Sequence, residues 1–120
     1  MAEVLDYKDL LVWQKSRQLV QEVYNLTCLL PKEEKYSLQS QLRRAVISIP
    51  SNIAEGYGRS YRPEYVRFLN IARGSCYEVE TQLLLCTDLN YLAPEQEARA
   101  MSLLKDTVRL LIVLIKRLEK

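Results

Sequence analysis

The chain has 120 residues and a mass of 14.0 kDa; 48% of its residues are hydrophobic and 27% are charged. This balance is typical of one globular domain, so we expect a single folded domain over residues 1–120 and exclude a disordered or collagen-like chain. The formal net charge is only +2, and the chain has no His, the side chain most used for acid–base chemistry near neutral pH. Three Gly and four Pro are too few for a fold with many tight turns, which favours helices over a sandwich or barrel.

The three cysteines indicate a reducing compartment. Cys28, Cys76 and Cys86 are an odd number without CxxC spacing, which fits neither a disulfide framework nor a zinc site. We expect all three to be small buried hydrophobic residues in a cytoplasmic protein. The longest apolar run, 110–115, is far shorter than the roughly 20 residues that span a bilayer, and no signal-peptide pattern precedes it.

The first two predicted helices cover residues 9–29 and 35–56. The first carries two stripes at helical spacing: Leu10, Trp13, Arg17, Val20 and Tyr24, and Val12, Leu19, Val23, Leu26 and Leu30. The second has an apolar face and an unusually polar back. Pro50 lies inside it and predicts a kink, since proline removes one backbone hydrogen bond and crowds the preceding turn. Gly56 and Gly58 are expected to end it in left-handed conformations.

The last two predicted helices cover residues 62–89 and 94–118. Ser60 and Pro63 are a helix-start signal, and Pro94 begins the fourth helix in the same way. Gly74, in the middle of the third helix, suggests a close approach of another backbone, because glycine there costs about 1 kcal/mol relative to alanine. The fourth helix has apolar residues at alternating steps of three and four, which is the spacing of a bundle seam. The pattern as a whole predicts an all-α, antiparallel up-down four-helix bundle with a kinked second helix.

The fourth helix is apolar well beyond one stripe. A bundle needs one apolar face per helix, so the additional residues need another cover, and a second copy of the chain is the simplest one. The alternative is that a kinked bundle surrounds the fourth helix on more than one side. The candidate oligomer-interface residues are Leu103, Leu110, Ile112, Val113 and Leu114.

Positive charge is concentrated between residues 35 and 73, which contain seven basic and two acidic side chains. Six of the seven are Arg, whose planar group pairs with phosphate, and tyrosines lie among them, as in proteins that contact single-stranded or looped RNA. The candidate nucleic-acid-binding residues are Arg43, Arg44, Arg59, Arg62, Arg67, Arg73, Tyr57 and Tyr61. The alternative is that these arginines pair with carboxylates. Arg44 and Arg73 are the most open to that alternative, because Glu55 and Glu80 lie within helical reach.

No pattern in the chain indicates an enzyme. The chain lacks a paired-carboxylate segment and a nucleophile with a recognisable base, and its GYGRS turn lacks the strand and the Lys of a phosphate-binding loop. We therefore expect no catalytic residue, no metal site and no cofactor.

Three segments carry a family resemblance: DLLVWQKSRQLVQEVYNLT, SLQSQLRRAVISIPSNIAEGYGRS and EYVRFLNIARGSCYEVETQLLL. They resemble the bacterial four-helix bundle proteins encoded in intervening sequences of large-subunit ribosomal RNA genes, over about residues 6–118. The resemblance implies an antiparallel bundle that assembles into a ring, typically a homopentamer, without catalytic activity. A related and generally more basic branch comprises accessory proteins of diversity-generating retroelements, which implies RNA and a reverse transcriptase as partners.

Two functional hypotheses from different classes follow. The first is an oligomeric RNA-binding scaffold, linked to ribosomal RNA intervening sequences or to retroelements. The second is a ring-shaped protein–protein adaptor that does not bind nucleic acid. Salt-dependent affinity for RNA separates them, because phosphate contacts release counterions.

Overall fold

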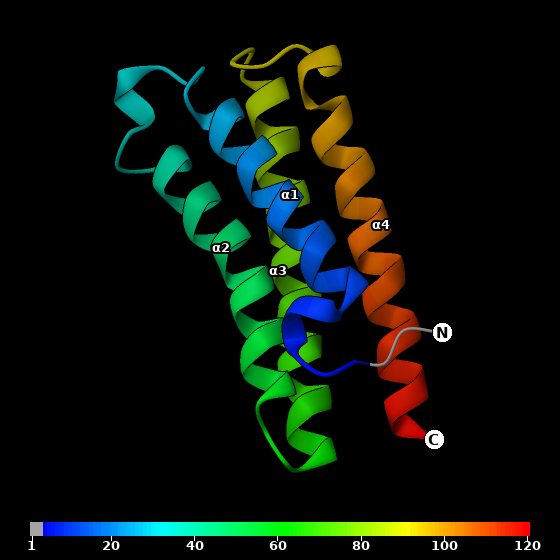
Figure 1. Ribbon diagram of the computed structural model, residues 1–120. Helices are drawn as coiled ribbons and strands as arrows, with labels where there is room; N and C mark the ends of the chain where they lie inside the picture. Colours follow the sequence, from blue (N-terminus) through cyan, green and yellow to red (C-terminus); the bar gives the residue numbers. More distant parts are fainter. Residues whose placement is uncertain (1–3) are drawn as a thin grey trace.

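A computed structural model describes residues 4–120 as a bundle of four long helices (Figure 1). The elements in chain order are the short 3-10 helix η1 (Tyr7–Asp9), α1 (Leu11–Thr27), the 3-10 helix η2 (Lys32–Glu34), α2 (Leu38–Tyr57), α3 (Arg62–Asp88) and α4 (Pro94–Glu119). No strand occurs in this part of the chain. The predicted all-α four-helix class is confirmed, and the helix bounds differ from the predicted ones by at most three residues.

Each helix packs against the two helices beside it. The chain reverses at every connection in Figure 1, and the contacts join α1 to α2 and α4, and α3 to α2 and α4. The most deeply buried side chains come from all four helices and include Leu19, Val23, Leu42, Val46, Ile49, Ile53, Leu69, Val79, Leu83 and Leu111. On α1 the buried stripe is the one that contains Val12 and Leu19, while Trp13 and Tyr24 pack against the core from its edge. The apolar pattern of the sequence therefore identified the buried stripe of α1 correctly.

The ends of α2 differ from the prediction. No glycine in residues 4–120 has a positive φ, so the left-handed conformations expected at Gly56 and Gly58 are wrong. Gly58 caps the helix with φ −72°, and Gly56 is still helical. The left-handed residue is Asn90 (φ 63°), in the connection before α4, because asparagine tolerates this region better than other side chains do.

Gly56, and not Gly74, marks the close approach of two helices. A Cβ added to Gly56 would lie 2.8 Å from the Cβ of Phe68 and 3.2 Å from Tyr65, both on α3. A Cβ added to Gly74 would meet nothing within 4 Å in the same chain. The close approach predicted at Gly74 is therefore absent within one protomer, and α2 and α3 come together most tightly next to the turn that joins them.

Pro50 lies within one continuous helix, α2. Two side chains near it bond main-chain carbonyls: Ser48 donates to the carbonyl of Ala45 (2.9 Å), and Asn52 donates to that of Ser48 (2.7 Å). Pro50 leaves the carbonyl of Val46 without the donor that it would have in an unbroken helix, and neither of these bonds reaches that carbonyl. The bend predicted at Pro50 stays a prediction.

Two of the cysteines are core residues and one is not. Cys76 and Cys86 are buried on α3, and burial raises the pKa of these thiols to about 12 and about 11. Cys28 follows the end of α1 and is exposed, so its predicted burial is wrong. None of the helices described is both long and apolar enough to cross a membrane.

The approach at Gly56 gives a stability prediction. Gly56→Ala should lower the free energy of unfolding by about 1–3 kcal/mol, because the methyl group has no space against Phe68. The matched control is Gly58→Ala, whose Cβ would make an ordinary 3.5 Å contact and whose effect should stay within about 1 kcal/mol. Urea unfolding measures both, and equal losses of stability would contradict the packing described here.

The cysteines give a second prediction. Under native conditions, iodoacetamide at pH 8 should modify Cys28 only, because the other two thiols are buried and remain protonated. After denaturation all three should react. Peptide mass spectrometry gives the sites, and rapid native labelling of Cys76 or Cys86 would show that the core opens far more readily than its packing implies.

Candidate nucleic-acid interface

The turn between α2 and α3 displays several of the predicted basic and aromatic residues at one end of the bundle. Pro63 lies in the first turn of α3, as predicted. Ser60 does not cap the helix. The cap residue is Tyr61, whose main-chain carbonyl accepts from the amides of Glu64 and Tyr65. The extended backbone of Tyr61 leaves its side chain 66% exposed beside Arg62.

Two arginines at this turn are paired with carboxylates three or four residues away in the chain. Arg67 donates from Nε to Glu64 (2.8 Å), and Arg59 lies 3.8 Å from Glu55. The Arg67 hydrogen bond lowers the pKa of the Glu64 carboxyl and raises that of Arg67. Both guanidinium groups also lie over the ring of Phe68: that of Arg59 is 5.0 Å from the ring centroid, and that of Arg67 is 4.7 Å from it. Their charges are therefore partly compensated, although both side chains stay exposed.

The pairing predicted for Arg44 and Arg73 is wrong. Within residues 4–120 no carboxylate lies within 4.0 Å of either guanidinium group, and Glu55 is instead beside Arg59. Arg44 is exposed and Arg73 is half-buried. Glu55 is eleven residues from Arg44 and Glu80 is seven residues from Arg73, whereas side chains on one helix meet at spacings of three or four.

Arg43 lies at the opposite end of the bundle from the α2–α3 turn. It donates from Nε to Oγ1 of Thr27 (2.9 Å), the last residue of α1, and its guanidinium group lies 4.6 Å from the ring centroid of Tyr24. Arg43 is half-buried. The structure thus does not place the six predicted arginines on one surface.

The tyrosines also divide into two kinds. Tyr57 packs edge to face on Tyr65, with ring centroids 6.1 Å apart, and is half-buried. Burial, and then the neighbouring Tyr57, raises the pKa of Tyr65 to about 12. Of the two predicted tyrosines, Tyr61 is the exposed one, at 66%.

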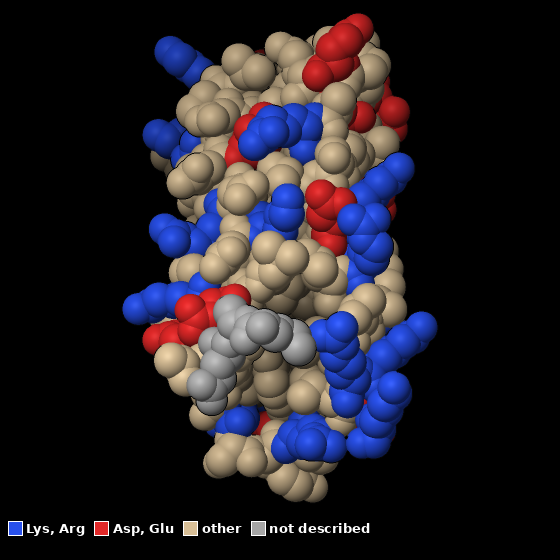
Figure 2. Space-filling view, turned by 45° about the vertical axis from the view of Figure 1, so that its right-hand side comes forward, with Lys and Arg blue, Asp and Glu red and all other residues tan. Residues whose placement is uncertain are grey.

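The end of α4 adds basic residues that the sequence prediction missed. Lys116 and Arg117 lie in its last turn and are exposed. Arg62 donates to the main-chain carbonyl of Lys120 (3.3 Å), and the two residues line one hollow of about 460 Å³ with Pro63, Val66, Leu118 and Glu119. Figure 2 shows basic side chains gathered at this lower end of the molecule. An antiparallel bundle brings the end of the fourth helix to the turn between the second and third. The predicted topology therefore already implied that Lys116 and Arg117 lie near this turn.

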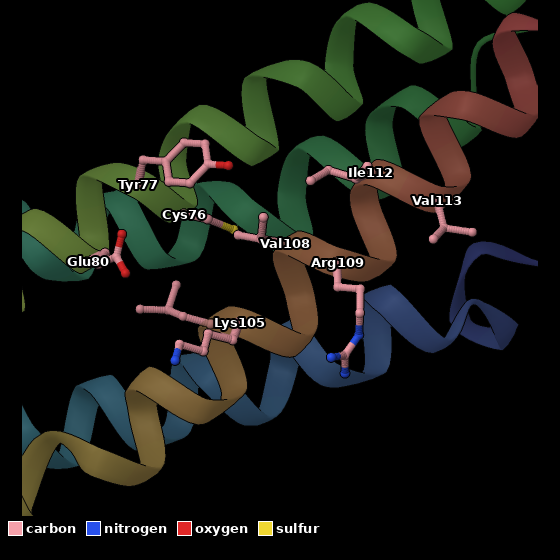
Figure 3. Close-up of a pocket in the computed structure, with 9 residues that line it drawn as sticks. Cys76, Tyr77, Glu80, Lys105, Val108, Arg109, Ile112 and Val113 are labelled. Carbon is pink, nitrogen blue, oxygen red and sulfur yellow. The ribbon is translucent and has the colours of Figure 1, made fainter.

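An apolar groove lies on the side of the bundle, between α3 and α4 (Figure 3). It has a volume of about 310 Å³; Cys76, Tyr77 and Glu80 contribute from α3, and Leu104, Lys105, Val108, Arg109, Ile112 and Val113 from α4. Tyr77 and Val113 are 48% and 41% exposed, and Leu84 and Leu85 continue the apolar surface along α3. The sequence pattern did not indicate the α3 residues of this surface, because the apolar excess in that pattern lies on α1 and α4.

The five predicted interface residues fall into three groups. Ile112 and Val113 line the groove between α3 and α4. Leu110 and Leu114 are half-buried and line a second hollow, between α1 and α4, of about 300 Å³. Leu103 is 6% exposed in the core of the same chain, so its side chain has almost no surface left for a partner.

The described residues contain no group of three or more His, Cys, Asp or Glu side chains arranged to hold a metal ion. The one buried carboxylate on α4, Glu97, accepts a 2.6 Å hydrogen bond from Thr87 of α3 and thereby ties the two helices together. The surfaces that remain are therefore an apolar side and a basic end.

Comparison with known proteins agrees with this architecture. The family model of the 23S rRNA-intervening sequence protein matches residues 8–113. A crystal structure of a protein of unknown function from the S23 ribosomal protein family of Bacteroides thetaiotaomicron is 30% identical, with a TM-score of 0.81, over 88% of this chain and 95% of that one. No curated protein matches the chain. The resemblance predicted from the sequence motifs is confirmed, and the chain belongs to the 23S rRNA-intervening sequence protein family.

Proposed function

We propose that the protein is a non-enzymatic scaffold that assembles into a closed ring of identical chains, a pentamer, and that this ring binds RNA. The observation that carries the proposal is the separation of two surfaces on one small bundle. The apolar groove lies along the side, between α3 and α4, while uncompensated basic residues lie at one end. Neighbouring chains can cover the side without covering the end.

The apolar side supports the assembly part. Tyr77, Leu84, Leu85 and Val113 are all more than two-fifths exposed on adjacent helices, an apolar concentration typical of an interaction site. Gly74 is exposed on α3, and no atom of another helix of the chain lies within 4 Å of the position that its Cβ would take. A partner backbone can approach closely at such a position, and a contact between two different surfaces of identical chains closes into a ring.

The basic end supports the RNA part. Arginines pair with phosphate oxygens through their planar donors, and a ring repeats each contact by symmetry, so weak local contacts act together. The partners proposed for this chain are further copies of itself and RNA. A reverse transcriptase stays a prediction of the family resemblance.

The pairing of Arg59 and Arg67 with glutamates favours the competing function, an adaptor ring that binds only protein. A guanidinium group already bonded to a carboxylate has fewer donors free for phosphate. The two functions share the ring and differ in whether RNA is bound, which is the property to measure.

Assembly gives the first prediction of this section. Light scattering coupled to size exclusion should give five times the chain mass of 14.0 kDa at micromolar concentration. Val113→Lys should dissociate the ring without unfolding the chain, because it puts a charge on an already exposed position in the groove. The control is Leu29→Lys, which is more exposed but lies after α1, outside the groove. A monomeric wild-type protein would refute the assembly.

RNA binding gives the second prediction. The wild-type ring should bind a single-stranded RNA of about 20 nucleotides, and log K should fall linearly with log salt concentration by about 0.7 for each phosphate contact. Fluorescence anisotropy between 50 and 300 mM salt measures the slope. Absence of binding, or an affinity that does not change with salt, would support the adaptor function instead.

A further inference from the structure

The basic end of the bundle brings together cations from two segments that are far apart in the chain. We call this surface the basic end and define it as residues 55–67 and 116–120. It contains six basic and three acidic side chains. The opposite end, residues 28–38 and 86–99, contains three basic and five acidic ones. One end of the bundle therefore carries a positive net charge and the other a negative one, along a molecule whose long axis is 44 Å.

Three cations at the basic end have no Asp or Glu partner. Within residues 4–120, Arg62, Lys116 and Arg117 have no Asp or Glu oxygen within 4.0 Å, and all three are exposed. Arg62 is bonded only to the main-chain oxygen of Lys120 (3.3 Å). The acidic residues nearby are largely engaged: Glu55 pairs with Arg59, and Glu64 with Arg67. The two ion pairs neutralise the glutamates of the α2–α3 turn, and the unpaired cations then set the sign of the surface.

Tyr61 gives this surface an aromatic component. Its side chain is 66% exposed, at the cap of α3 and directly before Arg62. An exposed ring among cations suits a single strand, whose unpaired bases can stack on it while the phosphates meet the positive charges. A duplex keeps its bases stacked inside and cannot use the ring in this way.

The other predicted arginines are less suited to this task. Arg43 is half-buried and bonded to Thr27 at the far end. Arg44 and Arg73 project from the middle parts of α2 and α3, so they do not join the cations of the basic end. These positions cannot form one continuous track with Arg62.

We propose that single-stranded RNA binds at the basic end, with phosphates on Arg62, Lys116 and Arg117 and a base stacked on Tyr61. This inference rests on the proposed RNA-binding function and locates its site. It adds the last turn of α4 to the site and removes Arg43, Arg44 and Arg73.

The test compares two variants that lose the same charge, one at the basic end and one away from it. The first is Arg62→Gln, Lys116→Gln and Arg117→Gln. The control is Lys32→Gln, Lys35→Gln and Arg44→Gln, which changes three exposed cations that also lack a carboxylate within 4.0 Å among the described residues. Glutamine retains helix propensity, and thermal unfolding and light scattering establish that both variants fold and assemble like the wild type.

The basic-end variant should lose at least about 10-fold in affinity for single-stranded RNA in 0.1 M salt, with a salt slope smaller by about two. The control should stay within about 3-fold of the wild type. Tyr61→Ser should lose about 5-fold or more on the single strand, while Tyr61→Phe retains binding. A duplex of the same length should bind more weakly and be insensitive to Tyr61.

The outcomes separate this inference from the function on which it rests. Equal losses of RNA affinity in both triple variants would overturn the location, because they would show that RNA responds only to the total charge of the protein. Unchanged affinity in the basic-end variant would overturn the location while RNA binding itself stands. If the wild-type protein binds no RNA, the proposed function fails, and the site fails with it.

Discussion

The approach of α2 to α3 at Gly56 is the constraint on which the rest of this structure depends. With no side chain at this position, the two helices lie close enough for Phe68 and Tyr65 to fill the space beside the turn. The turn is then short, and Arg59 and Arg67, which lie on either side of Tyr61, both lie over the ring of Phe68. A wider approach would separate these groups, and the aromatic and basic residues of the turn would no longer form one surface.

The same packing decides which side chains are left for partners. Because each helix contacts only its two neighbours, every helix has an outward side, and on α3 and α4 that side is apolar around Tyr77, Ile112 and Val113. Because the helices alternate in direction, the end of α4 returns to the α2–α3 turn (Figure 1). The apolar and the basic surfaces therefore arise from one arrangement, one from the sides of the helices and the other from their ends.

Much of the fold could be predicted from the sequence, because helical periodicity and proline positions are local signals. The four helices and the core stripe with Leu19 and Val23 follow from them. The surfaces were harder to predict, since they depend on which residues meet across helices. Arg43 and Arg62 are equivalent in a charge count along the chain, yet Arg43 is half-buried and bonded to Thr27, while Arg62 is exposed and bonded to the main chain of Lys120. Lys116 and Arg117 lie outside the basic segment in sequence and beside it in space. Gly56 and Gly74 differ in the space around them: a Cβ added to Gly56 would meet Phe68, and one added to Gly74 would meet nothing within 4 Å. The sequence alone does not show this difference.

The central claim is that RNA meets this bundle at its basic end, and photo-crosslinking tests it most directly. A single-stranded RNA containing 4-thiouridine, irradiated with the wild-type protein in 0.1 M salt, yields crosslinked peptides that mass spectrometry can locate. The account predicts crosslinks at Tyr61 and its neighbours in residues 57–67, and in the last turn of α4. Crosslinks confined to residues 28–44, or to the groove around Tyr77 and Val113, would contradict it.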